Sequence, residues 1–200
     1  MSKTRLEAFS DGVMAILITI MVLELRTPSG SDVEALRGIL PSLGIYALSF
    51  VFLGIYWNNH PHLLHATERV SGAVLWANLH LLFWLSLVPF VTRWMTETGL
   101  AQLPTAIYGC VFLLAAVGYW ILLRTILACQ PPGSKLAEAI GSDFKGNISV
   151  LGYVLGVALT FADRRLAVAM FGLVALMWLV PDRRIESRLS ERAEPSKSSA

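Results

Sequence analysis

Hydrophobic residues in this chain gather in long blocks that short polar segments separate. A helix rises about 1.5 Å per residue, so about 20 apolar residues cross the roughly 30 Å hydrocarbon core of a bilayer. Six blocks approach or reach that length, and they cover residues 8–25, 39–57, 71–92, 104–123, 147–161 and 166–180. The pattern predicts six transmembrane helices, the last two of which are short and form a hairpin around the charged turn Asp163-Arg164-Arg165.

The composition supports a membrane protein. Hydrophobic residues make up 55% of the chain and charged residues 15%, more apolar than an ordinary soluble domain. The first block lacks the small-x-small cleavage site of a signal peptide. We therefore predict an all-α membrane protein. Residues 1–181 would form a six-helix domain, and residues 182–200 a basic, disordered tail near anionic lipid headgroups.

The distribution of basic residues predicts the orientation of the chain in the cell membrane. With six spans, both termini lie on the same side, together with eleven of the 16 Lys and Arg residues. Loops on the cytoplasmic side of a membrane protein carry the excess of Lys and Arg. Both termini are therefore predicted to be cytoplasmic.

The first block contains Ser10, Asp11 and Thr19, which a plain membrane anchor would not need. Polar groups inside a bilayer are costly, so they usually face protein or a water path. On a helical wheel at about 100° per residue, Ser10 and Asp11 point away from one continuous stripe. That stripe consists of Phe9, Gly12, Ile16, Thr19, Ile20 and Leu23. The two sets are therefore expected to have different roles.

Two interpretations of the stripe remain open from its spacing. Apolar residues of a transmembrane helix commonly face lipid or the protein core, and a threonine hydroxyl can bond to the preceding turn of its own helix. If copies of the helix surrounded an axis, the stripe would form a narrow hydrophobic constriction with one ring of hydroxyls. Such constrictions gate by dewetting.

Polar residues of the first three predicted helices lie at a similar depth, near the cytoplasmic side. The group consists of Asp11, Trp57, Asn58, Asn59, His60, Asn78 and His80. Buried polar groups need hydrogen-bond partners, so we interpret them as a network that fastens the first helix to its neighbours. A proton relay through Asp11 and His80 is the alternative. A metal site at His60, His62 and His65 lacks an acidic or thiol ligand beside it, so no metal is predicted.

The start of the first helix also resembles a known family. Residues 5–19 read Arg-x-x-x-Phe-Ser-Asp-Gly-Val-x-Ala-Ile-x-x-Thr. This motif is similar to the signature of bacterial members of the transmembrane protein 175 potassium-channel family. Agreement continues at residues 57–60 (Trp-Asn-Asn-His) and at Asn78-Leu79. The resemblance covers the first 95 residues in detail and the whole chain in outline.

The resemblance implies a homotetramer of six-helix subunits in which the first helix lines a central pore. Ile16 would form the hydrophobic constriction, and Thr19, Ile20 and Leu23 would line the pore outward of it. Arg5, Ser10 and Asp11 would belong to the polar network that holds the pore helix. The partners implied in that network are Trp57, Asn58, His60 and Asn78.

The function expected from the residues and the resemblance together is passive conduction of potassium ions, with modest selectivity over sodium. A proton-coupled secondary transporter using Asp11 and His80 is the alternative, although the inverted repeats typical of transporters are not visible. A structural membrane protein without flux is the third hypothesis. The sequence contains neither a P-loop nor a serine-nucleophile motif, so an enzyme is not expected. The expected partners are potassium ions, the lipid bilayer and other copies of the chain, with no cofactor and no nucleic acid.

Overall fold

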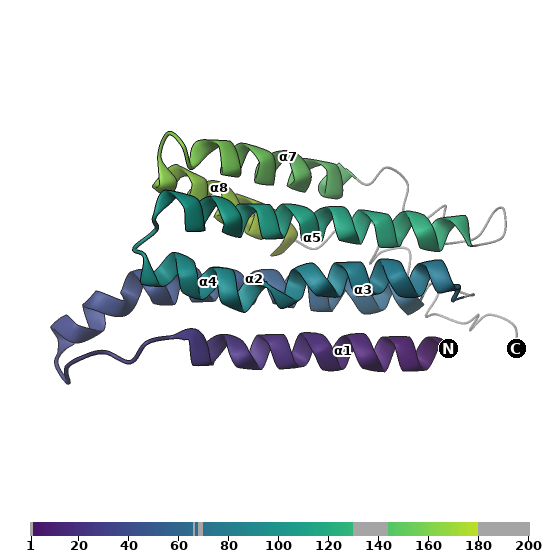
Figure 1. Ribbon diagram of the computed structural model, residues 1–200, viewed down its shortest axis with the longest axis horizontal. Coiled ribbons are helices and arrows are strands. Elements are labelled where there is room, and N and C mark those ends of the chain that lie inside the picture. The colour runs from purple at the N-terminus through teal and green to yellow at the C-terminus, as the bar shows by residue number, and fades with distance from the viewer. Residues whose placement is uncertain (1, 66, 68–69, 130–143, 180–200) are drawn as a thin grey trace, which may run out of the picture.

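The computed structural model describes residues 2–65, 67, 70–129 and 144–179, and all regular structure within these ranges is helical (Figure 1). The elements in chain order are α1 (Lys3–Ile20), the short 3-10 helix η1 (Met21–Glu24), α2 (Val33–His65), α3 (Gly72–Ser86), α4 (Val88–Glu97), α5 (Gln102–Ala128), α7 (Phe144–Leu159) and α8 (Arg164–Leu179). The predicted tail, residues 182–200, lies outside the described residues.

Four helical stretches are long and apolar enough to cross a membrane. They are Lys3–Glu24, Val33–Leu64, Gly72–Glu97 and Gln102–Ala128. α7 and α8 have 16 residues each, which is about 24 Å of helix. The carboxylate Oδ1 of Asp163 accepts a hydrogen bond of 2.7 Å from the Arg165 N–H, which caps the start of α8. The hairpin predicted around this turn is confirmed.

The third predicted span is divided by a break at Leu87, where α3 gives way to α4. Pro89 lies in the first turn of α4. A proline is tolerated there because the N–H groups of a first helical turn have no partner within the helix.

α2 is longer than the predicted span 39–57, since it remains helical through Pro41 and Pro61. Its start is capped by Asp32, whose Oδ1 accepts from the Ala35 N–H at 2.9 Å.

The helices form a layered bundle with α1 along one side and the α7–α8 hairpin on the opposite side (Figure 1). α5 packs between α3 and α7, whereas α1 packs on α2, α3 and α4. α1 and η1 contribute buried side chains at intervals of three or four residues: Leu6, Ser10, Met14, Leu17 and Met21. One face of α1 is therefore buried in its own subunit, and the face with the predicted stripe is not.

Aromatic rings fill the core between α2, α5, α7 and α8. The rings of Phe52 and Phe112 lie 4.4 Å apart, and those of Tyr108 and Phe171 lie 5.7 Å apart. Three glycines, Gly109, Gly152 and Gly156, leave the room that α8 needs to approach. A methyl group on Gly156 would collide with the ring of Phe171, so this ring fixes the distance between α7 and α8.

We predict that Gly109→Ala destabilises the fold by about 1–3 kcal/mol, because interiors tolerate extra volume poorly. The new Cβ would lie 2.5 Å from Cζ of Phe171 and 2.7 Å from Cγ2 of Val157. The measurement is the melting temperature of the detergent-purified protein. Gly172→Ala on α8 is the control, since its Cβ would meet nothing within 4 Å. Equal melting temperatures for the two variants would contradict this account of the packing.

Candidate functional site

The predicted stripe of α1 is exposed along its whole length in the single subunit. Ile16 is 57% exposed and Leu23 is 76% exposed. The positions 9, 12, 16, 19 and 23 follow one another at alternating intervals of three and four residues. A period of about 3.5 residues is the spacing of a seam along which helices pack lengthwise. The stripe is thus a regular, unpartnered seam on the outer side of α1.

Thr19 contributes a hydroxyl to this seam. Its Oγ1 donates a hydrogen bond of 2.9 Å to the carbonyl oxygen of Ile16, on the preceding turn of the same helix. The hydroxyl proton is therefore used within α1, as the sequence analysis had allowed. The lone pairs of the oxygen remain available as acceptors on the exposed face.

A buried hydrogen-bond chain joins α1, α3 and α2 through Ser10, Asn78 and His60. Ser10 donates to the carbonyl of Leu6 at 2.9 Å and accepts from Nδ2 of Asn78 at 2.9 Å. Oδ1 of Asn78 lies 2.6 Å from Nε2 of His60. Since this amide oxygen can only accept, Nε2 of His60 carries the proton. The three side chains are at most 1% exposed.

Asp11 lies beside the hydrogen bonds that join Ser10, Asn78 and His60, and takes no part in them. Its Oδ1 is buried and has no hydrogen-bond partner among the described residues. The carboxylates of Asp11 and Glu7 are electrostatic neighbours of His60. His80 instead accepts a hydrogen bond of 3.2 Å from Nε1 of Trp84 on its own helix. The described contacts thus join Ser10, Asn78 and His60, and they contain no link between Asp11 and His80.

Three further residues expected in the network, Arg5, Trp57 and Asn58, are exposed on the single subunit. Among the described residues, no hydrogen bond joins their side chains to Ser10, Asn78 or His60. Among the described residues, no group of three His, Cys, Asp or Glu side chains is placed to hold a metal ion.

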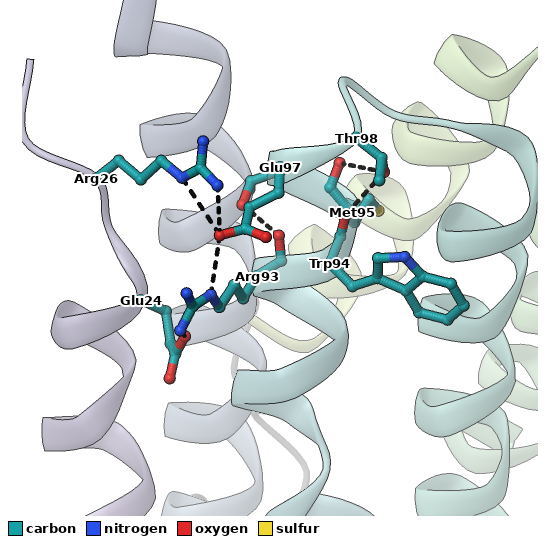
Figure 2. Close-up of polar contacts among 8 residues, drawn as sticks. Glu24, Arg26, Arg93, Trp94, Met95, Glu97 and Thr98 are labelled. Atoms are coloured by element: carbon teal, nitrogen blue, oxygen red, sulfur yellow. Dashed lines mark hydrogen bonds and ion pairs between the residues drawn. The ribbon is translucent and has the colours of Figure 1, made fainter. Parts of the chain in front are cut away.

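A second attachment of α1 lies at its other end and was not anticipated from the sequence (Figure 2). Arg93 on α4 pairs with Glu24 at 3.4 Å and with Glu97 at 2.9 Å. Glu97 also accepts from Arg26, whose Nη2 lies 2.7 Å away. The interval of four residues between Arg93 and Glu97 on one helix was the only local signal for these pairs. Together they tie the segment after α1 to α4.

Comparison with known proteins identifies the family. Residues 5–89 match the family model described as the endosomal/lysosomal potassium channel TMEM175. A potassium channel of Chryseobacterium sp. (strain P1-3) is 53% identical over 191 residues, which are 96% of this chain and 100% of that protein. The chain belongs to the TMEM175 family.

Two further TMEM175 relatives match over nearly their whole length, and a human relative matches over a shorter stretch. A potassium channel of Streptomyces collinus is 32% identical and covers 96% of this chain and 98% of its own. The crystal structure of a lysosomal potassium-selective channel TMEM175 homolog from Chamaesiphon minutus superposes with a TM-score of 0.78 at 27% identity, over 91% of this chain and 97% of that one. The human relative, named an endosomal/lysosomal proton channel, is 36% identical over 96 residues, 42% of this chain and 19% of its own. This TMEM175 chain is therefore a membrane protein of an ion-channel family.

We predict that Asn78→Ala lowers the stability of the protein by about 1–3 kcal/mol, because it leaves the buried Nε2–H of His60 without an acceptor. The measurement is again the melting temperature in detergent. Asn58→Ala is the matched control, since Asn58 is an exposed asparagine near the same end of the bundle. If Asn78→Ala leaves the melting temperature unchanged, the hydrogen bonds among Ser10, Asn78 and His60 do not hold α1 in place.

Proposed function

We propose that the protein is one subunit of a homotetrameric, potassium-permeable channel through which ions run passively down their gradient. The observation that carries this proposal is the regular seam on α1. Its side chains lie at the edge of the subunit and are not covered by the other helices of that subunit. Relatives over nearly the full length of the chain are named potassium channels, which favours the same function. Both termini would lie in the cytoplasm, on the side of the basic excess.

In this proposal four copies of α1 meet around the central axis, seam to seam. Ile16 would form a ring of apolar side chains, and such a ring stops ions unless water enters it. Thr19, Ile20 and Leu23 would line the path outward of this constriction. The Thr19 ring would offer hydroxyl oxygens to a partly dehydrated cation. Because those oxygens are few and uncharged, we expect a modest preference for potassium over sodium.

The two attachments of α1 would set the rotation of the pore helix. Ser10 is about 120° from Ile16 around the helix, so the bond to Asn78 inside the subunit turns Ile16 outward. Glu24 lies 14 residues further along, about 21 Å away, where Arg93 holds it. A helix fastened at both ends cannot rotate freely between them. The seam would therefore keep one orientation toward the axis.

We predict that Ile16→Asn enlarges the single-channel current, because a polar ring wets the constriction. The measurement is the current of purified protein in planar bilayers under opposed potassium and sodium gradients. The native currents should reverse toward the potassium potential. Leu173→Asn on α8 is the control, since Leu173 is 59% exposed and Ile16 is 57% exposed.

Two results would contradict the proposal in different ways. The absence of current in a preparation with an intact tetramer would contradict the channel itself. A normal native current that Ile16→Asn leaves unchanged, or that Leu173→Asn raises equally, would contradict the role of Ile16 alone.

A further inference from the structure

A pocket lies between α2, α5, α7 and α8, and α1 takes no part in it. Its room for the centres of water-sized molecules is about 60 Å³, and it is partly open to the outside. Six of the thirteen described residues that line it are aromatic: Phe52, Tyr56, Tyr119, Trp120, Tyr153 and Trp178. The hairpin that forms one wall lies on the opposite side of the bundle from α1 (Figure 1). If subunits meet around a central axis lined by α1, the pocket lies on the side of each subunit that faces away from the axis, toward lipid.

The pocket lies near the end of the bundle that carries the N-terminus. Asn59 is six residues before the end of α2, Trp120 is in the last third of α5, and Asn147 is in the first turn of α7. All three positions belong to the same end of the membrane domain. Tyr and Trp side chains gather at this depth in membrane proteins, where hydrocarbon meets headgroups.

Two cations stand beside the tryptophans that line the pocket. Cζ of Arg124 lies 5.4 Å from the ring centroid of Trp120, and Nζ of Lys145 lies 5.9 Å from that of Trp178. Among the described residues that line the pocket, none is acidic. The pocket therefore combines an apolar interior with a positively charged rim, which consists of Arg124 and Lys145 beside the lining tryptophans and not of lining residues themselves.

The polar groups of the inner wall are largely satisfied by the protein. Nε1 of Trp178 donates to Oγ of Ser149 at 2.7 Å, and Ser149 donates to the carbonyl of Lys145 at 2.8 Å. Asn147, by contrast, is exposed beside the rim. The interior thus demands little from a polar ligand, whereas the guanidinium of Arg124 and the amide of Asn147 lie exposed beside it.

We propose that this pocket binds one anionic glycerophospholipid, with an acyl chain among the aromatic rings and the phosphate at Arg124 and Lys145. Access from the bilayer, the apolar interior and the charge of the rim all fit this ligand. Basic pockets between transmembrane helices recognise anionic headgroups through the same chemistry. The lipid would come from the cytoplasmic leaflet, an assignment that rests on the orientation given under the proposed function.

The test is native mass spectrometry of the full-length protein, titrated in parallel with phosphatidylglycerol and phosphatidylcholine of equal chain length. We expect the native protein to retain phosphatidylglycerol preferentially. Arg124→Gln should weaken phosphatidylglycerol retention about fivefold, the effect of one basic side chain at an anionic surface, and leave phosphatidylcholine unchanged. Arg164→Gln, an exposed arginine at the opposite end of the bundle, is the matched control.

A second variant tests the acyl-chain part independently of charge. Ala116 lines the pocket, so Ala116→Phe should fill it and reduce the retention of both lipids. Melting temperatures identify a variant that fails to fold, in which case the Arg124→Gln comparison decides alone. Equal retention of the two lipids by the native protein, or equal losses with Arg124→Gln and Arg164→Gln, would overturn the proposal. Neither result would affect the proposed conduction, which the bilayer currents measure separately.

Discussion

The hydrogen-bond chain from Ser10 through Asn78 to His60 is the constraint on which the geometry of this protein depends. It joins three helices at one buried point, and Nδ2 of Asn78 keeps its acceptor on Ser10 only while α1 keeps its rotation. Breaking such a chain leaves buried polar groups unpaired, which costs more than its formation gains. The outward direction of the α1 seam is the geometric consequence of this inward bond.

The attachment at the other end of α1 is of a different physical kind. The pairs of Arg93 with Glu24 and Glu97 are exposed to solvent, so water screens their attraction and each pair contributes little to stability. Their effect is on position, since they connect the turn after α1 to α4 through long, adaptable side chains. The buried hydrogen bond at one end and the adaptable charged contact at the other together restrict the rotation of α1.

The sequence predicted the helices well because their signal is local. Long apolar blocks imply spans, and the charged turn at residues 163–165 implied the hairpin that the structure contains. The depth of polar residues brought His60 and Asn78 together and the family resemblance added Ser10, but neither says which face of a helix a side chain occupies. Arg5, Trp57 and Asn58 were expected in the same network and are exposed on the single subunit. The contact between Glu24 and Arg93 joins residues 69 positions apart, so no local pattern encodes it.

Whether the exposed seam meets copies of itself is tested most directly by crosslinking across subunits. Leu23→Cys would be introduced after Cys110 and Cys129 are replaced by serine, and the intact oligomer treated with a short bifunctional maleimide. Leu173→Cys, exposed on α8, serves for comparison. The account predicts covalent dimers from Leu23→Cys and none from Leu173→Cys. An intact oligomer that gives no dimer through Leu23→Cys would contradict an axial position for α1.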